Sequence, residues 1–99
     1  MNFQYDVDRI FSMENGKLLA EINFPHRDEK RVNITHVFVD ESLRGKGVAS
    51  HLMELAYSYL KGRGLLIIAK CPYAIEWFKK HVEYQDIVIN VKTKVATNQ

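Results

Sequence analysis

The stretch that decides the fold reads NITHVFVDESLRGKGVA, from Asn33 to Ala49. It begins with alternating and β-branched apolar residues, which are typical of a strand. It then passes through an acidic and polar turn into Arg-Gly-Lys-Gly at residues 44–47 and opens a segment with helical apolar spacing. A glycine-rich turn between a strand and a helix can bind an anion. Glycine lets a phosphate approach the backbone, and the first helical amides have no partner within the helix.

Downstream of this turn, the apolar spacing predicts a helix over Val48–Lys61 that a Gly-Arg-Gly segment terminates. The apolar run Leu65–Ala69 has strand length, which is typical of a central strand covered on both faces. A strand, a helix and a strand in this order predict a right-handed crossover between two parallel strands. A second helix is expected over about Tyr73–His81, and a last strand over Ile87–Val91.

Upstream of the turn, the sequence predicts an antiparallel meander of three strands. Its first two strands, Arg9–Met13 and Leu18–Phe24, flank an Asn-Gly pair, which is the strongest two-residue hairpin signal. A polar connector leads to the third strand, Arg31–Val39. The predicted fold is therefore α/β: a mixed, twisted sheet with an N-terminal antiparallel meander, a parallel strand–helix–strand unit and two main helices.

Composition narrows the class of protein. The 99 residues predict one domain over 1–99, and a net charge of +2 does not favour a nucleic-acid partner. The sequence shows no apolar run of membrane-spanning length and no signal-peptide pattern, and its single cysteine cannot form an internal disulfide. These features favour a cytoplasmic protein without membrane contact, and we expect a monomer. Its four histidines lack metal-ligand spacing, so no metal is expected.

The glycine-rich turn resembles motif A of the GCN5-related N-acetyltransferases, Arg/Gln-x-x-Gly-x-Gly/Ala, with Arg44, Gly47 and Ala49 at the fixed positions. In that family the loop amides hold the pyrophosphate of acetyl-coenzyme A. The resemblance extends over about Val32–Tyr84, and it implies acetyl-coenzyme A as a substrate. The cofactor-binding positions that it implies are Phe38, Val39, Leu43, Arg44, Gly45, Lys46, Gly47, Val48, Ala49, Tyr73 and Phe78.

A second segment, CPYAIEWFKKH from Cys71 to His81, departs from the family pattern. Cys71 replaces the usual Asn, and Phe78 replaces the Tyr whose hydroxyl commonly acts as general acid. Phenylalanine cannot donate a proton. The expected strand Arg31–Val39 also has no Asp or Glu where many members place a base. The pattern closely resembles a small single-domain subfamily that binds acetyl-coenzyme A and carries a cysteine in its site.

The candidate catalytic residues are Cys71 and His36. A thiolate is the reactive form of cysteine, and a helix start favours it. His36 would act as a base or as an orienting group. Three alternatives stay open: Cys71 as an inert buried side chain, His36 as a structural residue, and Arg44 with Lys46 as a solvated basic pair. We expect Trp77 to pack in the core. Core packing is also an alternative for Phe78, in place of contact with the cofactor.

Two functions follow from the resemblance. One is transfer of an acetyl group from acetyl-coenzyme A to an unidentified amine, with Cys71 assisted by His36. The other is a non-catalytic sensor or carrier of acetyl-coenzyme A, which the missing acid and base favour. Ordinary members carry helices between their first two strands, and the Asn-Gly hairpin leaves no room for them here. The acceptor side is therefore expected to be open.

Overall fold

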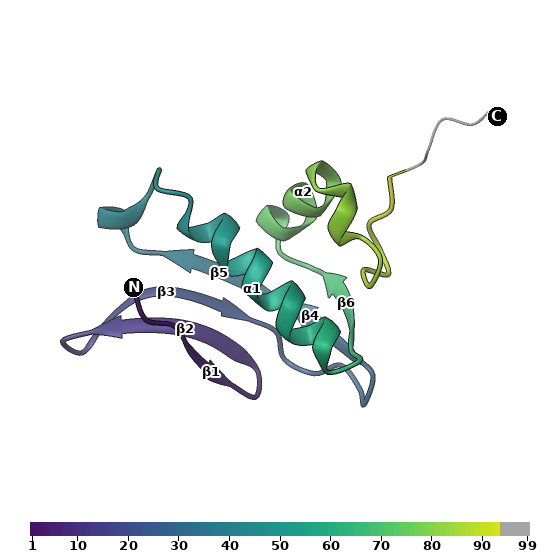
Figure 1. Ribbon diagram of the computed structural model, residues 1–99, viewed down its shortest axis with the longest axis horizontal. Coiled ribbons are helices and arrows are strands. Elements are labelled where there is room, and N and C mark those ends of the chain that lie inside the picture. Colours follow the sequence, from purple (N-terminus) through teal and green to yellow (C-terminus); the bar gives the residue numbers. More distant parts are fainter. Residues whose placement is uncertain (94–99) are drawn as a thin grey trace.

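Four antiparallel strands form the N-terminal half of the molecule, in the computed structural model that describes residues 1–93 (Figure 1). Their order is β1-β2-β3-β5, with bounds β1 Gln4–Asp6, β2 Arg9–Glu14, β3 Lys17–Asn23 and β5 His36–Val39. The predicted hairpin is confirmed, since Asn15 and Gly16 have φ angles of 52° and 78°, as a type I′ turn requires. The sequence prediction missed β1, because this short exposed edge strand carries no apolar alternation.

The predicted parallel pair is also confirmed. β4 (Arg31–Ile34) pairs in parallel with β6 (Leu66–Ala69), and α1 (Val48–Gly62) lies between them in sequence. The single strand expected over Arg31–Val39 is divided at Thr35, however. The Thr35 amide donates to the Asn23 carbonyl at 3.1 Å, so the chain leaves its partner β6 and joins β3 instead.

The C-terminal part corrects one prediction. The prediction of a last strand over Ile87–Val91 is wrong. In that segment only Val88 makes a β-bridge, and its partner is Ile67. The Asn90 side chain takes the place of a further strand residue. Its oxygen accepts from the Ala69 amide at 2.9 Å, and its nitrogen donates to the Ala69 carbonyl at 2.7 Å. The remaining elements are α2 (Pro72–Lys80) and two 3₁₀ turns, η1 (Glu41–Leu43) and η2 (Val82–Tyr84).

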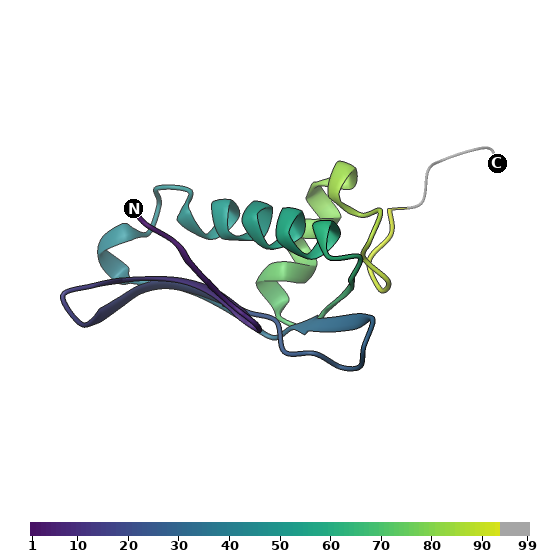
Figure 2. The same cartoon turned by 60° about the horizontal axis from the view of Figure 1, so that its bottom comes forward.

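One face of the antiparallel sheet carries the core. Figure 2 shows α1 lying along this face, and no helix of residues 1–93 covers the opposite one. Side chains alternate between the two faces of a strand. In β2, β3 and the two strands of the parallel pair, the apolar side chains of one face therefore point at the helices. The fully buried side chains at this interface include Ile10, Ala20, Ile22, Val32, Ile34, Leu52, Met53, Ala56 and Phe78.

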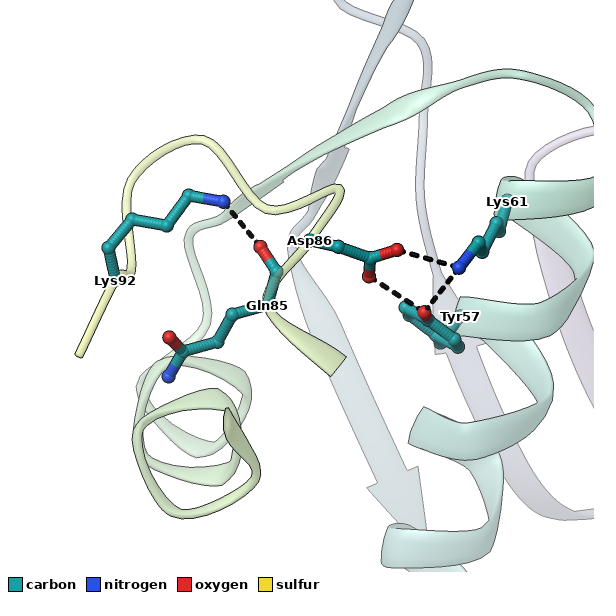
Figure 3. A network of polar contacts seen from close by, with 5 residues as sticks. All are labelled: Tyr57, Lys61, Gln85, Asp86 and Lys92. Atoms are coloured by element: carbon teal, nitrogen blue, oxygen red, sulfur yellow. Dashed lines mark hydrogen bonds and ion pairs between the residues drawn. The ribbon is translucent and has the colours of Figure 1, made fainter. Parts of the chain in front are cut away.

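A polar cluster joins the C-terminal segment to α1 (Figure 3). The Tyr57 hydroxyl donates to Asp86 at 2.7 Å, and the Lys61 ammonium donates to Asp86 at 2.6 Å and to Tyr57 at 3.1 Å. The hydrogen bond with Asp86 raises the pKa of Lys61 to about 12, and Lys61 lowers the pKa of Asp86. Buried Gln85, beside Asp86, donates to the Phe78 carbonyl at 2.7 Å. The segment after α2 is therefore bonded both to α1, through Asp86, and to α2, through Gln85.

Replacing Asp86 with Asn tests this cluster. We expect a loss of at most about 1 kcal/mol at neutral pH, because solvent screens an exposed ion pair. The lowered pKa of Asp86 means that its contribution is present above the ordinary value of 3.8 and is lost as the pH falls through the lower folded-state value. The difference in unfolding free energy between the two proteins, measured in urea, should therefore vanish in acid. Glu83→Gln is the control, and a pH-independent difference contradicts the assignment.

Candidate functional site

The glycine loop connects β5 to α1 and is fixed at its start by side chains. Asp40 caps η1 by accepting from the Ser42 amide at 3.1 Å and from the Ser42 hydroxyl at 2.5 Å, and these hydrogen bonds lower the pKa of Asp40. The Arg44 Nε donates to the Val39 carbonyl at 3.3 Å. Arg44 thus ties the loop back to β5, which gives it a structural contact in addition to any contact with a ligand.

Two glycines turn the loop into the helix. Gly45 and Gly47 have φ angles of +81° and +77°, in the left-handed region that glycine adopts without steric cost. Gly47 is the N-cap of α1, and the first turn of the helix contains no acidic residue. Within residues 1–93, none of the backbone amides from Gly45 to Ser50 donates a hydrogen bond. These amides and the helix dipole together favour a bound anion.

A pocket of about 240 Å³ lies against these amides. The cofactor-binding positions that the resemblance implies all line this pocket, except Phe38, Lys46 and Phe78. Ser50 also lines it and is not among the implied positions. Tyr73 reaches the pocket from the first turn of α2. Its side chain is 39% exposed, and partial burial raises the pKa of its phenol. The residues that line the pocket are Val39, Leu43, Arg44, Gly45, Gly47, Val48, Ala49, Ser50 and Tyr73.

The two strands beside this pocket separate. The Ile34 carbonyl accepts from the amides of Lys70 and Cys71, at 2.9 and 3.0 Å, and closes the β4–β6 ladder. Beyond that point β5 continues at the edge of the antiparallel sheet and β6 leads into α2 (Figure 1). The edge of β5 that faces away from β3 thus has no strand partner within residues 1–93. Ligands bind where neighbouring strands separate in this way.

Cys71 and His36 flank this opening, each two residues beyond the last β4–β6 pair, Ile34 and Ala69. Cys71 is partly exposed, packs against the core and is the N-cap of α2. His36 is exposed and alternates with core-packed Val37, so it projects toward the uncovered face. No hydrogen bond joins Cys71 to His36 in the described part of the chain. Their catalytic roles stay predictions.

The aromatic residues of α2 divide between core and pocket. Trp77 is 5% exposed and Phe78 is 0% exposed, and their rings pack edge to face with 5.3 Å between the ring centroids. This confirms the expected core packing. The Trp77 indole donates to the Ser50 hydroxyl at 2.7 Å and so links α2 to the first turn of α1. Sequence reasoning missed Ser50, because its partner lies far away in the chain and no local pattern reveals it.

The uncovered sheet face adds one acidic side chain near β5. Glu21 lies across from Phe38 in the β3–β5 register and forms an ion pair with Arg9 at 2.7 Å. The Arg9 guanidinium also lies over the Phe11 ring, 3.8 Å from its centroid. Glu21 is therefore held by a cation rather than available as a free base. The sequence prediction considered acids only on the strand before motif A and did not include Glu21.

Among residues 1–93, no three His, Cys, Asp or Glu side chains gather in an arrangement that could hold a metal ion. Neither helix in the same range combines the length and the apolar character that a membrane crossing requires.

Comparison with protein families gives one match over most of the chain. Residues 3–87 match the family model described as GCN5-related N-acetyl-transferase. No curated protein matches the chain. Among solved structures, a GCN5-like protein from Staphylococcus aureus has 24% identity and a TM-score of 0.78, with 98% of this chain and 96% of that one covered.

Larger acetyltransferases share the fold over part of their length. The ribosomal-protein-S18-alanine N-acetyltransferase from Escherichia coli has 18% identity and a TM-score of 0.59, covering 74% of this chain and 50% of that one. A predicted acetyltransferase from Clostridium acetobutylicum, solved with acetyl-CoA, has 16% identity and a TM-score of 0.55, covering 92% and 61%. At these identities the likeness shows the fold, and the chain spans only about half to three-fifths of the larger proteins.

Proposed function

The chain belongs to the GCN5-related N-acetyltransferase family, and from this we propose that residues 1–99 act as one domain that binds acetyl-coenzyme A and transfers its acetyl group to an amine. The observation that supports this most directly is the pocket at the start of α1. Three features of this pocket suit a diphosphate. Its backbone amides have no partner, two of its glycines are left-handed, and the first turn of the helix contains no carboxylate. The thioester arm would then run past Val39 and Tyr73 toward the opening between β5 and β6.

The chemistry requires little from side chains. The neutral amine nitrogen attacks the thioester carbonyl, the carbon–sulfur bond breaks, and coenzyme A leaves as a thiolate that takes up a proton while the amide nitrogen loses one. The Asp40 amide donates to the Leu19 carbonyl, so the alternation of the ladder turns the Phe38 amide toward β3 and leaves the Val39 amide on the free edge of β5 as the candidate donor to the carbonyl oxygen. Holding the thioester beside the acceptor supplies much of the remaining rate enhancement. The acceptor would approach from the uncovered face, toward which His36 projects because it alternates with core-packed Val37.

Cys71 offers a second route through a covalent intermediate. Its thiolate would attack the thioester, release coenzyme A and carry the acetyl group until an amine displaces it and regenerates the thiol. Its partial exposure and its place at the start of α2 support this assignment. Incubation with acetyl-coenzyme A should then give an acetylated protein by mass spectrometry that the Cys71→Ala variant does not give. An unmodified wild-type protein that still transfers acetyl would leave direct attack as the route.

A second function, binding of acetyl-coenzyme A without transfer, has its own support. Phe78 is fully buried at the usual position of the acid, and β5 has no Asp or Glu. Calorimetric titration with coenzyme A and acetyl-coenzyme A, followed by assay of free thiol released with candidate amines, separates the two. Binding with release supports the transferase, and binding without release supports the sensor or carrier. Absence of binding contradicts both.

A further inference from the structure

A carboxylate on the uncovered sheet face has no part in the chemistry described above. Glu21 lies on β3, and its side chain is only 13% exposed although no helix of residues 1–93 covers this face. Its Oε2 accepts from the Arg9 guanidinium at 2.7 Å, whereas its Oε1 accepts no hydrogen bond within the same range. The buried side-chain oxygen without a partner in that range is on Asn33, so Oε1 of Glu21 is accessible from outside.

Arg9 fixes this carboxylate in place. Its guanidinium lies over the Phe11 ring, 3.8 Å from the ring centroid, while its Nη1 donates to Glu21. A carboxylate has about four lone-pair sites, and this hydrogen bond uses one of them. A largely buried carboxylate gains from a further donor, because burial removes water from its oxygens. A cationic donor forms the strongest hydrogen bond of this kind.

Glu21 lies on the acceptor side of the proposed reaction. In the β3–β5 register it is opposite Phe38, so the two Cβ atoms are roughly 5 Å apart on the same face. Phe38 precedes Val39, whose amide is the candidate donor to the thioester carbonyl. Neighbouring strands are about 4.8 Å apart, so a nitrogen that attacks at the free edge of β5 lies roughly 6–10 Å from the Glu21 carboxylate. The attacking nitrogen is neutral, so a cation at Glu21 belongs to another group of the acceptor.

The other acidic residue beside this face does not offer an open oxygen. Asp40 follows β5, and its Oδ2 accepts from both the amide and the hydroxyl of Ser42. Its Oδ1 faces the Lys17 ammonium at 3.6 Å. Glu21 is therefore the carboxylate of the two that has an oxygen available to a ligand.

We propose that Glu21 binds a second, positively charged group of the acceptor, a short hydrocarbon chain away from the nitrogen that is acetylated. The cation donates to Oε1 of Glu21, and the chain lies over the Phe38 ring, whose face also attracts a cation. Because it requires acetyl transfer, this inference rests on the proposed function. The second charge comes either from a free diamine or from a basic side chain beside the amino terminus of a peptide, which present the same chemistry.

Two pairs of acceptors test this assignment in the assay of free thiol released from acetyl-coenzyme A. One pair is 1,4-diaminobutane and butylamine, and the other is the dipeptide Ala-Lys and its norleucine analogue. In at least one pair, the wild type should show about tenfold higher kcat/KM for the charged member, because a charge-assisted hydrogen bond is added. The difference should lie in KM, since Glu21 contacts no reacting atom.

Glu21→Gln should remove this preference, because it keeps the shape of the side chain and loses the charge. Glu14→Gln, an exposed acid at the end of β2, is the matched control and should retain the preference. Added salt should reduce the preference of the wild type, which tests the role of charge even if Glu21→Gln does not fold.

The pair that shows the preference identifies the source of the second charge. Equal kcat/KM within both pairs, with thiol released from each acceptor, overturns this inference and leaves the transferase intact. A preference that persists in Glu21→Gln, or one that salt does not change, overturns the role of Glu21. A protein that binds acetyl-coenzyme A and releases no thiol with any acceptor overturns the proposed transfer and this inference together.

Discussion

Replacement of Gly47 with Val should weaken binding of acetyl-coenzyme A by at least about 100-fold, equivalent to about 2.7 kcal/mol. Gly47 has a φ angle of +77°, where a β-branched side chain is strained. A Cβ atom built there meets no heavy atom within 4 Å, so the added side chain has open space at the pocket that Gly47 lines. The substitution therefore fills the place proposed for the diphosphate and also disturbs the turn that aims the amides.

Gly64→Val is the matched control for this experiment. Gly64 has a φ angle of +72°, equally open surroundings and a place just beyond the opposite end of α1. Both variants should lose similar stability in thermal unfolding, since the backbone strain is the same in kind. Calorimetry should show lost coenzyme binding only for Gly47→Val. Gly47→Ala, with about a tenfold expected loss, serves if the Val variant does not fold. Equal affinity in the Gly47 and Gly64 variants contradicts the loop assignment.

The features that the sequence predicted well are local. The Asn-Gly turn, the glycine loop and the start of α1 at Val48 each depend on residues a few positions apart, and the structure has them where the pattern indicates. The parallel pair β4–β6 also follows from local information, because a strand–helix–strand unit has few other solutions. The pocket that contains most implied binding positions is a direct consequence of these elements.

The features that the sequence missed depend on distant partners. The division at Thr35 arises because Asn23 accepts its amide, and nothing in the residues next to Thr35 signals this. The expected strand at Ile87–Val91 has suitable β-branched residues, yet the Asn90 side chain satisfies the Ala69 backbone in place of a further strand residue. Ser50 lines the pocket from the first turn of α1, and its hydroxyl accepts from the indole of Trp77, a residue far away in the chain. Composition carries no information on such pairings.

The position of Phe78 affects both stability and mechanism. The family pattern places a proton-donating Tyr there, whereas this chain has a ring that is 0% exposed and packs edge to face with Trp77. Truncation to Ala should cost about 3–5 kcal/mol, because it leaves a cavity in the core. That is a large share of the roughly 5–15 kcal/mol that stabilises a domain of this size. The melting temperature should fall by about 15–30 °C in calorimetry.

Tyr73→Ala is the control on the same helix, and its exposed ring predicts a much smaller fall in melting temperature. The mechanistic test is Phe78→Tyr. A phenol added at a fully buried position places its hydroxyl in the core without a ready partner, so we expect about 1–3 kcal/mol of destabilisation and no gain in acetyl transfer. A Tyr variant that is as stable as the wild type and faster in transfer would show that this position reaches the thioester. Without a donor at this position, the thiolate that leaves in the proposed transfer would take its proton from solvent or from a group near the start of α2, where Cys71 is the N-cap and Tyr73 lines the pocket.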